Sequence, residues 1–220
     1  MTTSEELLDR LRTERKGYLL SYHEIFARIE PSLLEAYAEL YRRLNLTPRT
    51  LTEFDREFIW VGLLASIHEE VGSIHIERAI AAGMSSEEML ISIRCTGFAD
   101  SWPTLEFSER AWSRFIGHRA IDVYADGLGE LAKGVEMRIV HLTLMNIQGQ
   151  RQRREAFDYH LLAALEAGAT TAQVAEALSY LLVPIGANGF LWCTDRWLEL
   201  LQEYGVPDEL SGIDFNTRRD

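Results

Sequence analysis

The segment HIERAIAAGMSS at residues 75–86 recurs as HLLAALEAGATT at residues 160–171. Both copies follow the pattern His-x3-Ala-x3-Gly-x-[Ser/Thr]-[Ser/Thr]. The alanine lies on the same helix face as the histidine, and its small side chain lets a neighbouring helix approach beside the imidazole. The glycine favours the left-handed conformation that ends a helix, and the Ser or Thr caps the next helix. The pattern predicts a helix, a turn and a second helix, and its repetition predicts two copies of one helical unit packed together.

Apolar residues elsewhere in the chain also recur at helical spacing, and strand-like alternation is almost absent. We expect a segment that opens at Pro31, and a helix from Asp55 towards Ile67 that stays helical to about Ala82. Later segments are expected at 85–100, 104–125, 135–148, 152–167, 171–182 and 187–204. The predicted fold class is all-α, with an N-terminal helix at 1–28, a first unit at 29–105, a second unit at 106–204 and a tail at 205–220.

Composition excludes several classes of protein. Asp and Glu number 34 against 22 Lys and Arg, and the formal net charge of −12 argues against nucleic acid, whose binding is driven by clustered Lys and Arg. No apolar run approaches the roughly 20 residues that cross a bilayer, so no membrane partner is expected. Residues 1–14 lack a secretion pattern, and the two cysteines, Cys95 and Cys193, are far apart. We expect a cytoplasmic protein.

The repeated pattern, with Arg56-Glu57 opening an apolar helix, resembles the carboxymuconolactone decarboxylase family. The alkylhydroperoxidase AhpD has the same all-α fold. The resemblance covers residues 31–102 and again 124–197. It implies an AhpD-like helical fold of two tandem units, in which one chain replaces a dimer, and a homo-oligomer such as a dimer or trimer.

The family's peroxidase branch uses a Cys-x2-Cys-x3-His dithiol. In this chain His68 and Val71 stand at the two cysteine positions before His75, and Arg153 and Ala156 stand there before His160. A thiolate is the nucleophile of that cycle, so we do not expect thiol peroxidase activity.

The resemblance to the decarboxylase branch implies an acid–base role for the motif histidine, together with a carboxylate. His68 and His75 are two helical turns apart, so on one continuous helix both would project from one face, about 10 Å apart. Val71 and Gly72 would lie between them, and Gly72 would leave room for a shallow pocket. We predict His75, Glu70 and His68 as catalytic residues, and Glu57, Gly72 and Val71 as substrate-binding residues. A purely structural alternative makes His68 a polar surface residue and Gly72 a helix-packing residue.

The second copy offers His160 and Arg153 as further substrate-binding residues, because an arginine can hold a carboxylate in a bidentate pair. We expect no metal and no cofactor: HEEVG at residues 68–72 lacks the second histidine of HExxH, and a spacing of seven is too long for two ligands on one helix. A metal joining His68 or His75 to His160 remains an alternative.

These observations predict a cofactor-independent acid–base enzyme that acts on a small anionic substrate, a carboxylated lactone or a related oxo or enol acid. Decarboxylation, isomerisation and elimination would use the same groups. The alternatives are a non-catalytic oligomeric binding protein and a metal-dependent lyase or hydrolase.

Overall fold

The computed structural model describes residues 3–15, 17–205 and 207–212, and the described chain is helical with no strand. The predicted all-α class is therefore confirmed. Contacts between residues divide the chain into two compact units, Met1–Pro48 and Arg49–Asp220. The repeat units predicted at 29–105 and 106–204 stay a prediction, and most of the predicted tail at 205–220 lies outside the described residues.

The first unit consists of α1 (Ser4–Glu14), α2 (Ser21–Ile29), α3 (Pro31–Tyr41) and a short π-helix, η1 (Arg42–Leu46). Thr3 caps α1 and forms a capping box with Glu6, and Pro31 occupies the first position of α3, as its fixed φ favours. The core is small and is made of Leu7, Leu11, Ala27 and Leu34.

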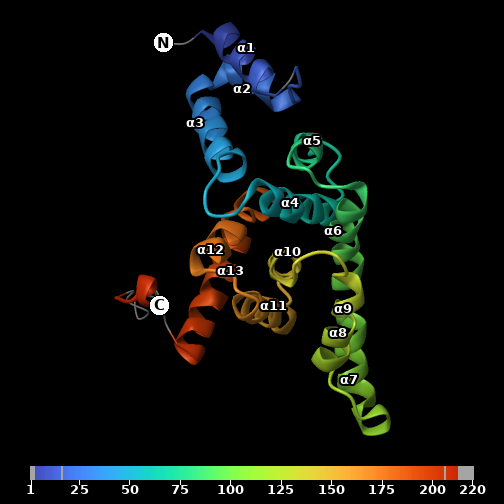
Figure 1. The fold of residues 1–220 in the computed structure, drawn as a ribbon. Helices are drawn as coiled ribbons and strands as arrows, with labels where there is room; N and C mark the ends of the chain where they lie inside the picture. Colours follow the sequence, from blue (N-terminus) through green and yellow to red (C-terminus); the bar gives the residue numbers. More distant parts are fainter. Residues whose placement is uncertain (1–2, 16, 206, 213–220) are drawn as a thin grey trace. The chain divides into compact units, whose positions relative to one another are not determined.

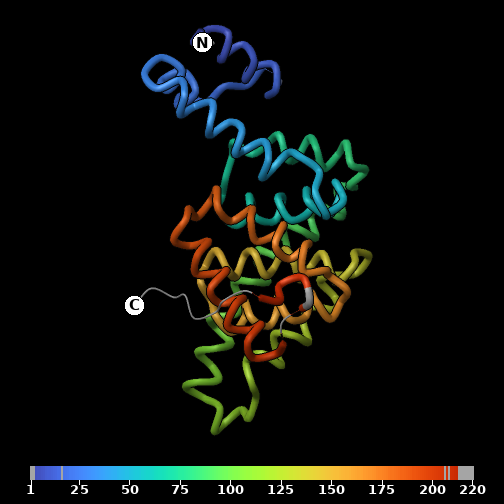
Figure 2. Tube along the Cα trace, turned by 90° about the vertical axis from the view of Figure 1, so that its left-hand side faces the viewer, coloured from blue at the N-terminus to red at the C-terminus, as the bar shows by residue number. Residues whose placement is uncertain are grey.

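The second unit begins with α4 (Glu53–Ile67), α5 (Ser73–Ala81) and α6 (Ser86–Ala99). A hairpin of α7 (Trp102–Ile116) and α8 (Ala120–Asp126) follows, with the short α9 (Leu128–Leu131). The chain then forms α10 (Met137–Gln150), α11 (Arg154–Glu166), α12 (Thr171–Ser179), α13 (Leu182–Tyr204) and the 3₁₀ turn η2 (Asp208–Leu210). Gly186 breaks the helical geometry inside α13. Figures 1 and 2 both show the α7–α8 hairpin projecting from the rest of this unit.

Helices α4 and α10 form the centre of the second unit. Residues 55–64 of α4 and 139–149 of α10 are buried, and the two helices pack against each other. A Cβ at Gly62 would lie 2.6 Å from Cγ2 of Thr143, so this glycine permits the close approach. Arg138 also donates to Asp55 at 2.9 Å across the pair.

The predicted turns between the paired helices are confirmed in both copies. Gly83 and Gly168 adopt positive φ values of 86° and 94° and end α5 and α11. Ser85 and Thr170 cap α6 and α12, each through a capping box. These are local signals in which glycine and hydroxyl side chains have direct backbone roles.

Three predicted helix boundaries are wrong. The N-terminal helix expected at 1–28 is interrupted, since α1 ends at Glu14 and α2 begins at Ser21. The helix expected from Asp55 towards Ile67 does reach Ile67, but the chain does not stay helical to Ala82, because His68 takes the left-handed conformation (φ 55°) and residues 68–72 form a turn. The amides of His68 and Glu69 donate to the carbonyls of Ala65 and Leu64, which is a Schellman motif. The segment expected at 104–125 is likewise two helices, since Gly117 (φ 67°) ends α7.

Candidate functional site

Glu57 and His75 form a buried pair in the second unit. Glu57 lies in the first half of α4 and His75 near the start of α5, and Oε2 of Glu57 is 2.7 Å from Nδ1 of His75. The two side chains are 0% and 1% exposed. The indole of Trp60 stacks on the imidazole with ring centroids 4.4 Å apart. Two residues of α4, Glu57 and Trp60, therefore contact the imidazole of His75.

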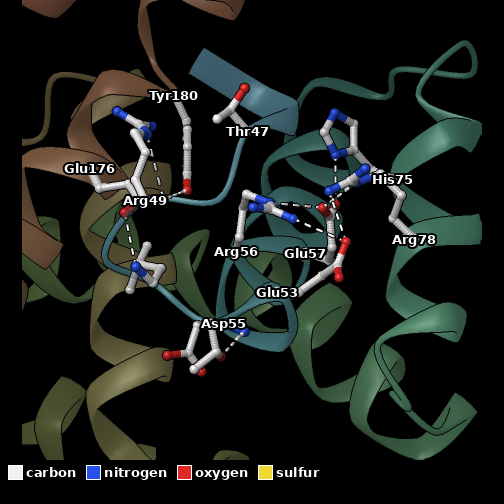
Figure 3. Close-up of polar contacts among 12 residues, drawn as sticks. Thr47, Arg49, Glu53, Asp55, Arg56, Glu57, His75, Arg78, Glu176 and Tyr180 are labelled. Carbon is white, nitrogen blue, oxygen red and sulfur yellow. Dashed lines mark hydrogen bonds and ion pairs between the residues drawn. The ribbon is translucent and has the colours of Figure 1, made fainter. Parts of the chain in front are cut away.

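The other carboxylate oxygen of Glu57 binds two arginines. Nε of Arg56 donates to Oε1 at 3.0 Å, and Nε of Arg78 donates to the same oxygen at 2.7 Å. Glu53 joins both arginines, at 3.2 Å from Nη2 of Arg56 and 2.8 Å from Nη2 of Arg78. Figure 3 shows Glu57 between Arg56 on one side and His75 with Arg78 on the other. The formal charges of the two carboxylates and the two guanidiniums cancel.

Burial and these partners decide the protonation of the pair. Burial raises the pKa of Glu57, but hydrogen bonds and charge from His75, Arg78 and Arg56 outweigh it, and the pKa lies below the ordinary value. Burial lowers the pKa of His75 more than the Glu57 contact raises it. We therefore assign a carboxylate and a neutral imidazole near pH 7. Nδ1–H then donates to Glu57, and Nε2 is the basic nitrogen.

A second carboxylate anchors the segment that leads into α4. Glu176 of α12 is buried, and its Oε2 accepts the amides of Thr50 and Leu51 at 2.6 and 2.9 Å. Its Oε1 accepts the hydroxyl of Tyr180 at 2.7 Å. The Tyr180 ring in turn lies 5.3 Å from Trp60. Residues of α12 and just beyond it thus support the face of α4 that carries Trp60.

His160 lies in a different buried network. Its Nδ1 is 3.0 Å from Nδ1 of His141, and its Nε2 is 3.1 Å from the Tyr124 hydroxyl. Gln148 donates to that hydroxyl at 3.0 Å, so Tyr124 donates to Nε2 and His160 donates from Nδ1 to His141. Burial lowers the pKa of His141 to about 4 and holds that of His160 well below its usual value. His141 is the fifth residue of α10, as Glu57 is of α4.

The other predicted site residues do not gather around His75. His68 and Glu70 are exposed in the turn at residues 68–72, so the expected face carrying both His68 and His75 does not exist. Val71 and Gly72 also lie in this turn, and a Cβ at Gly72 would come within 2.5 Å of the Leu64 side chain. Gly72 therefore packs the turn onto α4. Catalytic roles for His68 and Glu70 stay predictions.

Arg153 has a structural set of partners. Its Nη1 donates to the Ala99 carbonyl at the end of α6 at 2.8 Å, and its Nη2 lies 3.4 Å from Asp100. This cation, expected to hold a substrate carboxylate, is thus bound to protein oxygens. Sequence reasoning missed Arg56, Arg78 and Trp60 as neighbours of His75. A signal was present in the sequence, since Arg56 directly precedes Glu57 and Trp60 follows it by three residues, about one helical turn.

The described residues also bear on metal binding and on membrane insertion. Within the described residues, no group of three or more His, Cys, Asp and Glu side chains is placed to hold a metal ion. Over the same residues, no helix combines the length and apolar character needed to cross a membrane. Cys95 and Cys193 are buried free thiols, and burial raises the pKa of each to about 12. Neither thiol has the low pKa of a reactive cysteine.

Comparison with known proteins finds no match: no protein-family model, no curated protein and no solved structure is similar to this chain at a significant level.

Proposed function

We propose that the chain is a cofactor-independent acid–base enzyme whose proton-transfer group is His75, oriented by Glu57. The observation that supports this most is the 2.7 Å contact between Oε2 of Glu57 and Nδ1 of His75, with both side chains buried. A buried carboxylate fixes the tautomer of an imidazole and stabilises the imidazolium that forms when the other nitrogen takes a proton. Glu57 takes the orienting role that the sequence assigned to Glu70.

The chemistry this pair supports is proton transfer at a carbon next to a carbonyl. Nε2 of His75 takes the proton, the C–H electrons pass into an enolate, and the imidazolium returns the proton to the same or another carbon. Alternatively Nε2 of His75 first takes up a proton from solvent, the substrate carboxylate leaves as carbon dioxide, the electrons of the broken C–C bond form the enolate, and the imidazolium gives its proton to the enolate carbon. Neither route needs a cofactor.

The substrate class in this proposal is a small carboxylated lactone or a related oxo or enol acid. The class rests on the resemblance to the carboxymuconolactone decarboxylase family. It is supported by the two guanidiniums, Arg56 and Arg78, that adjoin Glu57. The overall charge of −12 repels anions, so an anionic substrate has to be held by local donors.

The test is a panel of such acids incubated with the protein in D2O and followed by NMR. We expect deuterium incorporation or loss of carbon dioxide for at least one compound, and a loss of about a hundredfold or more in rate for His75→Gln. His118→Gln is the matched control, because His118 lies in the α7–α8 hairpin, where its Nε2 forms a hydrogen bond with Ser108 at 2.9 Å. A rate unchanged by His75→Gln contradicts the proposal.

A second candidate function is an oligomeric binding protein without catalysis. One observation favours it: α7 exposes large apolar side chains, with Phe115 and Ile116 73% and 58% exposed. Such side chains often mark surfaces that contact another protein. Light scattering of the wild type and of a Phe115→Ser, Ile116→Ser double variant tests self-association. A monomer at every concentration removes this candidate.

A further inference from the structure

Two buried donors beside His75 have no hydrogen-bond partner. They are Nη1 of Arg56 and Nε1 of Trp60. The Arg56 side chain is 0% exposed and Trp60 is 3% exposed, so bulk water does not supply a partner. A buried N–H without an acceptor costs free energy comparable to a lost hydrogen bond, and such groups are rare in native proteins. Each of these two N–H groups calls for an acceptor.

The two donors lie on one face of α4 and flank the candidate site. Arg56 and Trp60 are four residues apart, so their side chains are neighbours along the helix. The other guanidinium nitrogens of Arg56 bind Glu57 and Glu53, and the Trp60 ring lies against His75. Tyr180, which contacts the Trp60 ring, gives its own hydroxyl to Glu176. Its hydroxyl oxygen accepts from neither of the two unpaired N–H groups.

We propose that Arg56 Nη1 and Trp60 Nε1 form a subsite for the carboxylate of a small-molecule substrate, next to the imidazole of His75. This inference rests on the proposed function and deepens it. Both groups only donate, and one belongs to a guanidinium, so the acceptor that suits them is an anionic oxygen. The pairing of Glu53 and Glu57 with Arg56 and Arg78 leaves the site formally neutral, so it does not repel an incoming anion.

The subsite replaces the role that the sequence assigned to Arg153. Arg153 donates to the Ala99 carbonyl and Asp100, whereas Arg56 binds Glu57 through Nε and keeps its Nη1 donor unused. A carboxylate held there places the carbon that bears it close to the imidazole. That placement is what proton transfer at the neighbouring carbon, or loss of the carboxylate itself, requires.

The probe is acetate, with acetamide as the neutral comparison, titrated at constant ionic strength into 15N-labelled full-length protein. Trp60→Phe identifies the indole N–H signal of Trp60 and keeps an aromatic ring on His75. We expect a saturable shift of that signal with acetate and none with acetamide. With the His75 resonance as the readout, we expect Trp60→Phe to weaken acetate binding about tenfold.

A matched control is Trp197→Phe, which removes another indole N–H without a partner, on α13. It should leave acetate affinity unchanged. Arg56→Lys keeps the charge but loses the forked donors, and we expect it to weaken binding to a similar extent as Trp60→Phe. If Arg56→Lys fails to fold, Trp60→Phe alone decides the question.

A site occupied by water alone shows no saturable acetate shift, and that result overturns the inference. Equal acetate affinity in wild type and Trp60→Phe overturns it as well. The proposed function fails by a different result, namely turnover that survives His75→Gln. If His75→Gln still binds acetate but has lost turnover, the result supports both the carboxylate subsite and the proposed function.

Discussion

Oε2 of Glu57 accepts a hydrogen bond from Nδ1 of His75 at 2.7 Å, although the two residues belong to different helices. The contact depends on the turn at residues 68–72, which reverses the chain and lays α5 against α4. It also depends on Arg56 and Arg78, which hold the other oxygen of the carboxylate. The pair is therefore a product of tertiary packing.

Replacing Glu57 by Gln removes the charge that orients His75 and pairs the two arginines. We expect the rate of the panel reaction to fall at least about a hundredfold, and the free energy of unfolding to fall by about 3 kcal/mol, because buried Arg56 loses its counter-charge. Urea denaturation measures the second effect. Glu53→Gln is the control: its carboxylate is 51% exposed, so it should cost under about 1 kcal/mol. Equal costs for the two variants would contradict this account.

Glu176 ties the segment before α4 to α12. Glu176→Ala removes the acceptor of two amides and two hydroxyls, those of Thr50, Leu51 and Tyr180. We expect a loss of about 3 kcal/mol in the free energy of unfolding, since several buried donors are left unpaired. Tyr180→Phe removes a single bond and should cost about 1 kcal/mol. Hydrogen exchange should speed up at the Thr50 and Leu51 amides in Glu176→Ala only.

Substitution of Gly72 tests the packing of the turn between α4 and α5. A Cβ there meets Leu64 at 2.5 Å, so Gly72→Ala should destabilise the protein by about 1–3 kcal/mol. Gly97 lies inside α6 with nothing within 4 Å of an added Cβ. Gly97→Ala should therefore stabilise the protein by roughly 0.5–1 kcal/mol through helix propensity. Thermal denaturation of both variants should show shifts of opposite sign.

The turn at residues 68–72 is a feature of the fold that the sequence did not predict. Gly83 and Gly168 ended their helices as predicted, because glycine at a helix end is a local signal. α4 ends at Ile67 instead, where His68 adopts positive φ with Schellman hydrogen bonds around it and with Gly72 packed on Leu64. Nothing in the local composition indicates that ending.

The sequence predicted only part of the candidate site, because the rest of the site also depends on tertiary packing. The repeat and the resemblance pointed to His75, Glu70 and Glu57, and spacing on an assumed single helix added His68. The turn leaves His68 and Glu70 exposed. Tyr180 and Glu176 support Trp60 and the segment before α4 from a part of the chain far away in sequence. Such contacts come from tertiary packing and carry no signature in periodicity.

Because the pKa of His141 is lowered in the folded protein, we expect the protein to lose stability in acid. Its pKa is about 4 in the folded protein and ordinarily 6.5, so the unfolded chain takes up the proton first. Neutral His141 contributes about 3 kcal/mol to the free energy of unfolding above pH 6.5, and this contribution is lost as the pH falls towards 4. His141→Asn keeps an acceptor for His160 and should flatten this part of the pH profile. An unchanged profile would show that His141 is not buried as a neutral imidazole.

The central claim is that Glu57 holds His75 as a neutral imidazole with its proton on Nδ1 and Nε2 as the base. The most direct measurement is long-range 1H–15N correlation NMR of the His75 ring at pH 7, assigned with His75→Gln. We predict a protonated Nδ1, an unprotonated Nε2, and a pKa below 6.5 on titration. An imidazolium at pH 7, or a proton on Nε2 with Nδ1 bare, would contradict it.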